Sequence, residues 1–404
     1  MDISIIIPVK ERGEILLRTL HSLYRQVKVD PLSIEIIIVD NGSKESIGNF
    51  LDKEQCPFEM KVIRANAKTN NRSYVRNTGI QAASGSVILF LDCDVMLLPD
   101  SLYQHYQCVK QDRFNVSIGY TFQSNKQPKT IPNTFDEVRG NDSYSRDRRL
   151  VFQEDNYTYN WQHAWLFAAA GNLAVSSYLV SCCHGFNETF SEWGCEDTEF
   201  GMNLMKHGAK FYFNKNAAGI HFPHLWISKN RQSFTRTAER LYQLEPCIEL
   251  ELLCTNRSWK MVEYSRLLEN IKVNRFDGNI KTRADVYIGD HREINVADGI
   301  HIFPFSQEGY PLFGFKTPFE SHTISTVLFL PSWRNFLRDD LTGLFEEGFR
   351  ISRRVYIICL ADPDEESCWD GTYATLKLVL AEFYSLRLIE TASQIEVYEM
   401  REKE

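Results

Sequence analysis

Two hydrophobic patterns alternate along the first 95 residues of the chain. Short runs rich in Ile, Val and Leu, which are typical of buried β-strands, occupy residues 3–8, 34–40, 61–66 and 87–92. Amphipathic stretches with helical spacing lie between them, at residues 15–26 and 73–85. Strands that alternate with helices predict an α/β fold with a mostly parallel sheet flanked by helices.

Three of the predicted strands end at a residue that can face a ligand. Pro8, Asp40 and Asp92 close the first, second and fourth strands. In open sheets of this class, ligands bind outside the carboxyl ends of the strands. Each residue alone could be a strand terminator, but the three together indicate the rim of a pocket.

The pattern changes three times further along the chain. Residues 100–165 are polar and irregular, which predicts either an acceptor-side or lid segment or a surface insertion. Helical periodicity dominates residues 231–280 and predicts a connector. Apolar strand patterns and one helical pattern return in residues 281–404 and predict a smaller second α/β domain. The expected domains are therefore 1–230, 231–280 and 281–404.

Charge and cysteine usage narrow the class of protein. The 404 residues carry 45 Lys and Arg against 53 Asp and Glu, so the net charge of −8 argues against a nucleic-acid partner. The basic cluster Arg146, Arg148 and Arg149 is interpreted as a solvated loop. Ten scattered cysteines without a C-x-x-C pair indicate reduced thiols, and the N-terminal residues do not resemble a signal peptide. We therefore expect a cytoplasmic protein.

One uncharged stretch is as long as a membrane-spanning helix. Residues 165–183 carry no charge, but Gly171, Asn172 and three serines favour a buried element of the fold. We therefore expect no transmembrane segment, while a peripheral membrane contact stays open.

A first carboxylate pair follows the fourth predicted strand. Asp92 and Asp94 flank Cys93, and if the extended geometry persists they share one face while Cys93 points to the other. Carboxylates at a strand end suit Mg²⁺ or Mn²⁺, which bind oxygen ligands and complete their shell with substrate phosphates. Taken alone, the spacing also fits a turn or a helix cap.

A second carboxylate pair opens a predicted helix. Residues 191–208 predict a turn and then a helix from near Glu196 to Lys206, with Gly208 as its C-terminal cap. Acidic residues in a first helical turn suit the helix dipole, which is sufficient reason for Glu196 and Asp197 to be there. The alternative is a catalytic role.

Four segments in fixed order resemble family 2 type glycosyltransferases with the GT-A fold. The block WGCEDTEF within the last of them is similar to the W-G-x-E-D segment of inverting galactosyl-, N-acetylgalactosaminyl- and chondroitin-type transferases. The resemblance covers about residues 1–230 and implies a Rossmann-like, nucleotide-sugar-binding catalytic domain there. The segments are residues 4–23, 35–43, 75–95 and 185–208.

The resemblance implies a donor site built by residues at the strand ends. It implies that six residues hold the base, ribose and diphosphate of a nucleotide sugar, namely Pro8, Val9, Glu11, Asp40, Arg76 and Asn77. Lys10 and Arg12 depart from the smaller or neutral residues common in this loop. The expected base is uracil.

The resemblance also implies a Mn²⁺ or Mg²⁺ cofactor. Asp94 would ligate the ion directly, and Asp92 would contact the ribose or bind the ion through water. His221 falls where related enzymes place a histidine ligand. His224 competes with it for that role, and simple packing is the alternative for either histidine.

Inverting transfer requires a base on the acceptor side. Asp197 is the predicted base that takes the acceptor proton, and Glu196 the neighbour that orients substrate hydroxyls. Trp193 would be a platform for a sugar ring, with a core tryptophan as the alternative. No enzyme nucleophile is needed when the sugar passes through an oxocarbenium-like state, so the product is expected to be inverted.

The implied activity is metal-dependent, inverting transfer from a UDP-sugar to a hydroxyl of a glycan, lipid-linked or peptide acceptor, as in polysaccharide biosynthesis. A nucleotidyltransferase and a catalytically silent nucleotide-sugar-binding protein are the alternatives. The C-terminal domain contains no catalytic motif. It is expected to position a large acceptor or to form a homo-oligomer.

Overall fold

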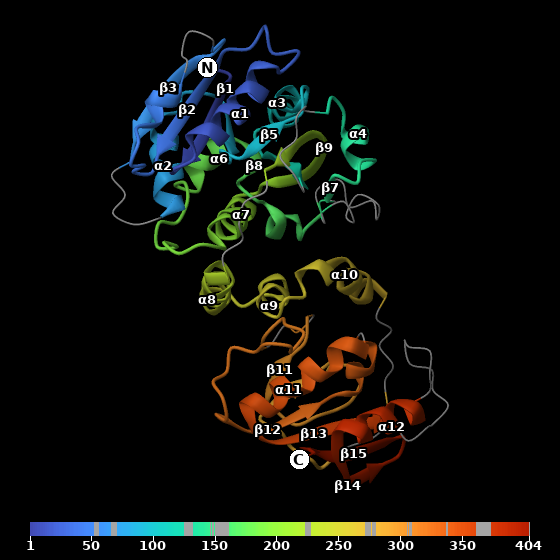
Figure 1. The fold of residues 1–404 in the computed structure, drawn as a ribbon. Coiled ribbons are helices and arrows are strands. Elements are labelled where there is room, and N and C mark those ends of the chain that lie inside the picture. Colours follow the sequence, from blue (N-terminus) through green and yellow to red (C-terminus); the bar gives the residue numbers. More distant parts are fainter. Residues whose placement is uncertain are drawn as a thin grey trace. The chain divides into compact units, whose positions relative to one another are not determined.

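The chain forms two compact units, Met1–Ala238 and Glu239–Glu404, each with its own sheet (Figure 1). We describe them from a computed structural model. The structure describes residues 1–51, 56–65, 71–124, 132–145, 147, 149, 161–222, 228–270, 276, 280–304, 306, 309–336, 338–360 and 373–403.

The first unit is built on a nine-stranded sheet. Its strands are β1 (Ile3–Val9), β2 (Ile34–Asp40), β3 (Glu59–Arg64), β4 (Val87–Leu91), β5 (Val95–Leu97), β6 (Asn115–Ser124), β7 (Tyr144–Ser145), β8 (Asn172–Ser176) and β9 (Lys210–His221). The helices are α1 (Gly13–Tyr24), α2 (Arg72–Ala82), α3 (Ser101–Gln111), α4 (Phe135–Arg139), α6 (Ser177–Cys182) and α7 (Glu196–Lys206), with 3-10 turns η1 (Ile47–Phe50) and η3 (Ala164–Phe167). The boundary of the unit at Ala238 falls within a further helix, α8 (Ser228–Leu244).

The sheet has the order β3-β2-β1-β4-β8-β6-β9-β5, with β7 attached to β6. The first four strands are parallel, as the alternating pattern predicts. β8 runs antiparallel between β4 and β6, so β6 points in the same direction as β4. The predicted α/β class is therefore confirmed, and the carboxyl ends of β1, β4 and β6 lie along one edge of the sheet.

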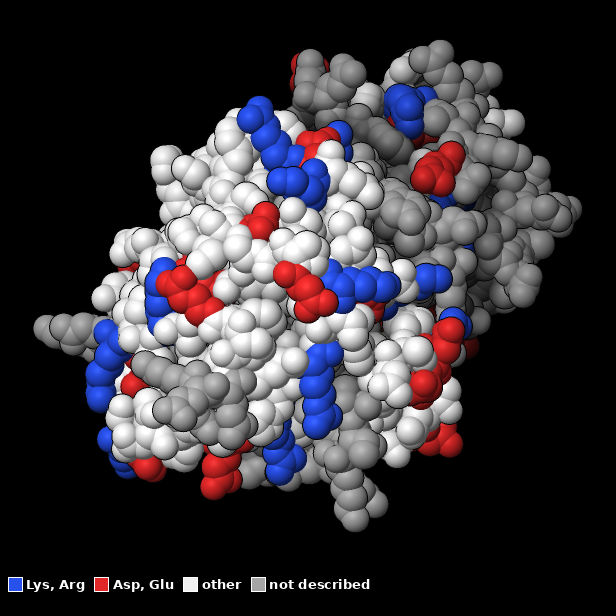
Figure 2. Space-filling view, turned by 90° about the horizontal axis from the view of Figure 1, so that it is seen from above, with Lys and Arg blue, Asp and Glu red and all other residues white. Residues whose placement is uncertain are grey.

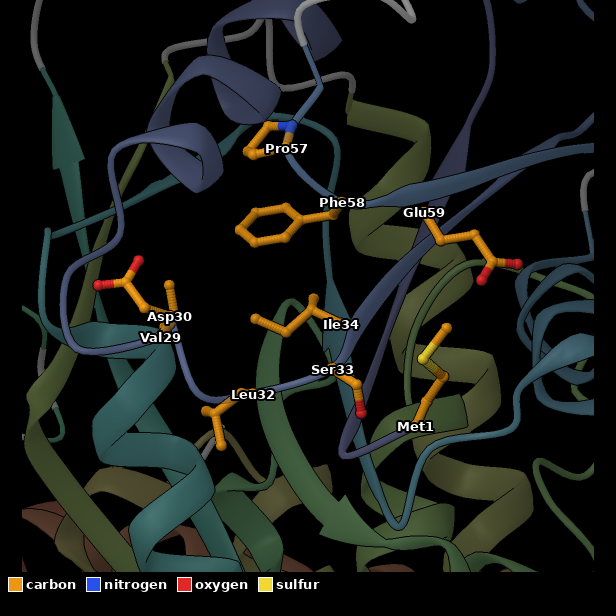
Figure 3. A pocket seen from close by; sticks show the side chains of 9 residues that line it. All are labelled: Met1, Val29, Asp30, Leu32, Ser33, Ile34, Pro57, Phe58 and Glu59. Carbon is orange, nitrogen blue, oxygen red and sulfur yellow. The ribbon is translucent and has the colours of Figure 1, made fainter.

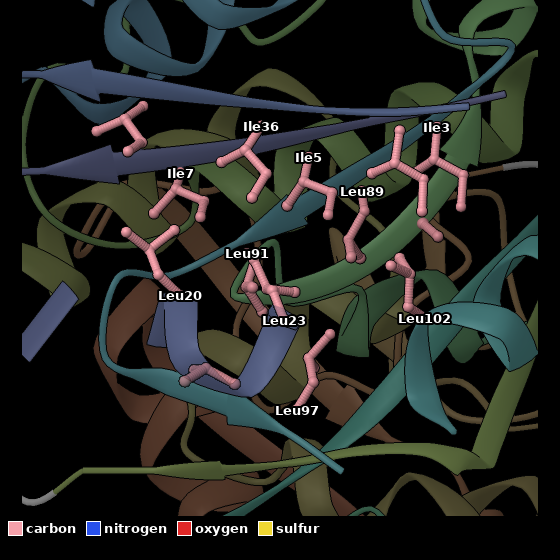
Figure 4. Packing of buried hydrophobic residues seen from close by; sticks show 14 of the residues in the cluster. Ile3, Ile5, Ile7, Leu20, Leu23, Ile36, Leu89, Leu91, Leu97 and Leu102 are labelled. Atoms are coloured by element: carbon pink, nitrogen blue, oxygen red, sulfur yellow. The ribbon is translucent and has the colours of Figure 1, made fainter. Parts of the chain in front are cut away.

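Alternation along β1 sends side chains to two helical layers. Ile5 and Ile7 pack in a cluster with Leu20 and Leu23 of α1 and Leu102 of α3 (Figure 4). On the opposite face, α2 approaches so closely that a Cβ on Gly79 would lie 2.4 Å from Ile6 Cγ2. Because both faces are covered, the strands read as continuous apolar runs. Each buried Ile or Leu contributes about 1.5–3 kcal/mol of transfer free energy.

The second unit contains a six-stranded sheet of order β11-β10-β12-β13-β15-β14, in which β15 is antiparallel to both neighbours. Its strands are β10 (Val286–Ile288), β11 (Ile300–Ile302), β12 (Ile324–Phe329), β13 (Ser352–Leu360), β14 (Tyr384–Ala392) and β15 (Ile395–Glu402). The helices are α9 (Ile248–Cys254), α10 (Met261–Asn270), α11 (Leu341–Ile351) and α12 (Tyr373–Phe383), with 3-10 turns η4 (Ser258–Lys260), η5 (Pro331–Asn335) and η6 (Arg338–Asp340).

The uncharged stretch 165–183 is a buried part of the sheet. It contains most of η3, the strand β8 and the short helix α6, so the prediction of a buried element is confirmed. Among the described residues, no helix is both long enough and apolar enough to cross a bilayer. The cysteines within the described residues are free thiols, as their scattered spacing predicts.

Candidate active site

A cavity of about 920 Å³ opens at the carboxyl ends of β1, β4 and β6. It lies at the sheet edge where the sequence predicts a ligand site, and residues as far apart along the chain as Pro8 and His221 line it. The predicted site residues that line it are Pro8, Val9, Glu11, Arg76, Asp92, Asp94, Trp193, Asp197 and His221.

Two predicted donor residues support loops and do not line the cavity. Asp40 is buried, and its Oδ1 accepts a hydrogen bond of 2.8 Å from the amide of Ser43. Asn77 fixes the loop before α7, because its Nδ2 donates to Phe186 O and its Oδ1 accepts from Phe186 N. Asn41, the neighbour of Asp40, lines the cavity in its place.

The first carboxylate pair lies in a turn after β4. The amide of Val95 donates to the carbonyl of Asp92 (3.1 Å), so the extended geometry assumed for strand alternation does not persist. Cys93 packs into the core cluster, and all three residues of this turn contribute to the cavity wall. Burial raises the pKa of the Cys93 thiol well above its usual value, so this thiol is no nucleophile.

Asp94 divides its two oxygens between a histidine and an arginine. The pairing of β5 with β9 sets Val95 beside His221, which brings His221 Nε2 to 3.4 Å from Asp94 Oδ1. Arg12 Nη1 donates to Asp94 Oδ2 at 2.5 Å. Only 5% of the Asp94 side chain is exposed, against 14% for His221. The competing His224 lies outside the described residues.

Asp94 and His221 are a suitable pair of ligands for a divalent cation. Mn²⁺ and Mg²⁺ are commonly held by one or two protein groups together with substrate phosphates. Within the described ranges, no three His, Cys, Asp or Glu side chains gather closely enough to hold an ion by themselves. An ion here would need ligands from substrate or water.

Arg76 connects the two carboxylate pairs. Its guanidinium is buried and lies 3.1 Å from Glu196 Oε1 and 3.4 Å from Asp92 Oδ1. Burial alone would raise the pKa of Asp92, but Arg76 and Arg72 outweigh it and hold that pKa below its usual value. Asp92 is therefore ionised at neutral pH.

Asp197 has the opposite electrostatic setting. Burial, followed by the neighbouring Glu196 carboxylate, raises the pKa of Asp197 to about 6. At pH 7 the Asp197 carboxylate is then mostly ionised, and it is more basic than an ordinary aspartate. General base catalysis favours a group with a pKa close to the working pH. Its place in the cavity wall exposes it to a bound substrate.

Glu196 is held by contacts within the protein. It is buried, and besides the Arg76 contact its Oε2 accepts from the amide of Gly194 at 3.2 Å. It does not line the cavity, unlike Asp197. These contacts fix the turn before α7 and the position of Arg76.

The turn before α7 depends on unusual backbone angles. Gly194 has φ +108°, and a Cβ there would lie 3.0 Å from Phe234 Cα. Cys195 follows at φ +59°. α7 then begins at Glu196, as the sequence predicts. Trp193 is half-buried in the cavity wall, with the Arg72 guanidinium 6.0 Å from its ring centre.

Arg149 belongs to the cavity wall, although the sequence predicts a solvated loop for it. It is 7% exposed, and both its Nε and Nη2 donate to Asp147. Its Nη2 also donates to Gly119 O, whereas its buried Nη1 has no hydrogen-bond partner among the described residues. Arg146 and Arg148 lie outside the described residues. No sequence motif distinguishes Arg149 from these neighbours.

Two further cavity residues, at the start of β8, were missed by the sequence reasoning. Asn172 is buried and donates to Ala217 O, while its Oδ1 faces His105 Nε2 at 2.9 Å. Burial lowers the pKa of His105 to about 4, so this imidazole is neutral. Gly171 permits the approach of Asp92, since a Cβ on Gly171 would lie 2.9 Å from Asp92 Oδ2.

A second hollow of about 370 Å³ lies at the opposite edge, by the starts of β2 and β3 (Figure 3). Val29, Leu32, Ile34 and Phe58 give it an apolar wall, and it contains none of the predicted site residues. On the face seen in Figure 2, Lys and Arg alternate with Asp and Glu in small groups. The predicted site residues that line a cavity therefore lie at the carboxyl edge of the first sheet.

Two family models match the first unit. Residues 4–171 match "Glycosyl transferase family 2", and residues 148–225 match "N-terminal domain of galactosyltransferase". Together they cover both carboxylate pairs and every predicted site residue.

Curated relatives match the same part of the chain. Chondroitin synthase of Pasteurella multocida (strain Pm70) is 28% identical over 233 residues, which are 52% of this chain and 24% of that protein. Chondroitin synthase of Escherichia coli is 26% identical over 242 residues, or 54% of this chain and 34% of the relative. The chain thus spans about a quarter to a third of the length of these two relatives. Validoxylamine A glucosyltransferase of Streptomyces hygroscopicus subsp. limoneus is 25% identical, covering 66% of this chain and 62% of the relative.

Among solved structures, S. aureus TarS 1-349 in complex with UDP-GlcNAc is similar with a TM-score of 0.45 and 14% identity. The match covers 68% of this chain and 77% of that one.

Proposed function

Because the chain belongs to glycosyltransferase family 2, we propose that its first unit transfers a sugar from a UDP-sugar to a hydroxyl acceptor, with inversion at the anomeric carbon. One observation carries the proposal. A carboxylate whose pKa is raised to about 6, Asp197, lines the same cavity as the Asp94 and His221 pair. A base and a candidate cation site thus face one substrate space.

The donor is proposed to bind along the β1 side of the cavity. The loop after β1 contributes Pro8, Val9 and Glu11, and Asn41 follows β2. Arg72 adds a positive charge beside them. Base and ribose would lie at these strand ends, and the diphosphate would point toward Asp94. The relatives named as sugar polymer synthases and the UDP-GlcNAc complex of TarS motivate the choice of UDP.

A Mn²⁺ or Mg²⁺ ion would be held by Asp94 and His221. Such an ion supplies positive charge where negative charge develops on the leaving diphosphate. Asp92 is proposed either to contact the ribose of the donor or to bind the ion through a water molecule. Its low pKa keeps it charged for either role.

Asp197 is proposed to accept the proton of the acceptor hydroxyl. Trp193 stands four residues before it on the same wall and offers an aromatic face to a sugar ring. Glu196 holds Arg76, which in turn contacts Asp92. Glu196 is thus proposed to orient the Asp92 carboxylate toward the donor. A single displacement by the acceptor then gives an inverted product.

The second unit is proposed to position a large acceptor or to join copies of the chain. The acceptor itself, whether glycan, lipid-linked sugar or peptide, is part of this proposal. A separate sheet without a catalytic motif suits either task, because both need surface and not reacting groups.

The proposed donor chemistry can be tested by UDP release from a panel of UDP-sugars. We expect turnover of one sugar that requires Mn²⁺ or Mg²⁺ and stops in excess chelator. Asp94→Asn should lower it at least about 100-fold, because an amide binds a hard cation poorly. Asp30→Asn, an exposed carboxylate of the opposite hollow, is the control. Full turnover in chelator would contradict metal dependence, and turnover of no UDP-sugar would contradict the donor.

A further inference from the structure

Arg12 forms an ion pair with Asp94, the carboxylate that the proposed ion would bind. Its Nη1 lies 2.5 Å from Asp94 Oδ2, while Asp94 Oδ1 faces His221. The Arg12 side chain is 38% exposed, whereas Asp94 is almost fully buried. The guanidinium therefore reaches from the open side of the cavity onto a carboxylate that has little access to water.

The loop that presents Arg12 is held in place. Glu11 has φ +54°, a left-handed conformation that is uncommon for a residue with a side chain. Its amide donates to Ser43 Oγ at 2.9 Å, and its Oε1 accepts from the amide of Lys44 at 2.9 Å. Backbone strain maintained by surrounding contacts is typical of functional loops. The Arg12 contact thus starts from a fixed backbone and depends only on its flexible side chain.

A guanidinium and a divalent cation compete for the same carboxylate. Both are positive, and within contact distance in a shielded cavity they repel strongly. An ion that binds Asp94 must therefore displace Arg12. The displaced side chain still belongs to the loop of Pro8 and Val9 on the donor side of the cavity. A donor diphosphate there would give it a new anionic partner, because Arg binds phosphate oxygens well.

We propose that Arg12 is an internal counter-cation of Asp94. It weakens binding of a divalent cation until a nucleoside diphosphate is present, and so it makes ion and nucleotide bind cooperatively. This inference rests on the proposed donor chemistry and adds the order in which that site fills. Since coupling between two ligands is reciprocal, the ion must tighten the nucleotide by the same factor.

The test is Mn²⁺ binding to the full chain, measured from the EPR signal of the free ion, with and without UDP. For the unmodified chain we expect UDP to tighten Mn²⁺ about tenfold, within the range of about 5- to 150-fold usual for such coupling. Arg12→Met should bind Mn²⁺ alone about tenfold more tightly and keep only the smaller part of the UDP effect that comes from direct phosphate ligation of the ion. Arg12→Lys, which keeps a positive charge, should bind Mn²⁺ alone as weakly as the unmodified chain.

Lys10→Met is the matched control, because Lys10 is a cation of the same loop that also lines the cavity. It should leave the coupling between Mn²⁺ and UDP in place. Equal Mn²⁺ affinity of Arg12→Met and the unmodified chain would overturn the inference, as would an equal gain in Lys10→Met. Absence of UDP binding in every variant would instead contradict the proposed donor, which separates the two failures. Circular dichroism of each variant establishes that it is folded.

Discussion

Glu251 of the second unit and the Asp92 and Asp94 pair of the first unit differ in the partners of their carboxylates. In the second unit, Glu251 accepts backbone N–H bonds of 2.6–2.7 Å from Phe313, Gly314 and Phe315. In the first unit, Asp94 and Asp92 meet the side chains of arginines at the edge of a cavity. A carboxylate surrounded by backbone amides fixes a loop and loses those bonds only by local unfolding. One that is paired with a flexible guanidinium can exchange it for a ligand.

Glu347 of the second unit and Asp197 of the first unit show a similar contrast. Glu347 accepts from both the amide and the hydroxyl of Thr317 and pairs with Arg350, so it is fully engaged in holding a loop to α11. Asp197 instead lines the cavity with a raised pKa. Burial of an acidic residue is therefore no sign of catalysis by itself. The catalytic candidates differ from Glu347 because their carboxylates line the cavity.

The largest expected effect is that of Asp197→Asn. It removes the proposed base without changing size, so sugar transfer should fall about 10²- to 10⁴-fold while UDP binding stays unchanged. Transfer is measured by product formation and UDP affinity by calorimetry. Glu196→Gln, at the adjacent residue that holds Arg76, tests the assignment of the two roles. A dead Glu196→Gln beside an active Asp197→Asn would reverse the two roles.

Glu251→Gln should act on stability alone. The amide keeps one acceptor oxygen and turns an NH₂ toward backbone N–H donors, so we expect the free energy of unfolding to fall by about 3 kcal/mol. Denaturant unfolding of the full chain measures this loss. Glu263→Gln, on the exposed face of α10, should change it by less than about 0.5 kcal/mol. A loss of transfer in folded Glu251→Gln would contradict a purely architectural role.

A smaller effect is expected from pH. The folded-state pKa of Asp197 is raised to about 6, so the proposed base loses its charge as pH falls through that value. The transfer rate should therefore drop about tenfold between pH 7 and pH 5. The residual rate of Asp197→Asn should lack this step. If that variant showed the same step, another group would be titrating.

The sequence predicts much of the first unit because its signals are local. The runs of Ile and Val give β1, β2 and β4, and α7 begins at Glu196 and ends at Lys206 as its caps indicate. Asp92 and Asp94 are found for the same reason, since a buried run ends at a charged pair. Even the turn at Asp92, which breaks the assumed alternation, leaves Cys93 in the core.

The missed residues depend on contacts between distant parts of the chain. Arg12 and Asp94 are 82 positions apart, and no local pattern states that they meet. Arg149 belongs to a basic cluster in which no sequence pattern sets it apart, but Asp147 and Gly119 hold it in the cavity wall. Asp40 and Asn77 show the reverse, since their side chains hold loops and do not line the cavity.

The smallest expected effect concerns the first unit without the second. The helices α9 and α10 belong by their contacts to the second unit. Tyr264 packs 4.7 Å from the Phe313 ring and donates to Asp340, and Glu251 holds residues 313–316. A chain that ends at Ala238 removes these helices together with their partners, whereas one that ends at Asn270 leaves Tyr264 and Glu251 without them.

We therefore expect the chain ending at Ala238 to fold and to bind UDP within about twofold of the full chain, because the residues proposed for the donor lie within residues 8–221. The chain ending at Asn270 should be less soluble, since it exposes buried apolar and charged groups. Thermal unfolding and UDP titration of both chains measure this. A folded chain ending at Ala238 that does not bind UDP would mean that the second unit supplies part of the donor site, and the contrast between chemistry in one unit and architecture in the other would then be lost.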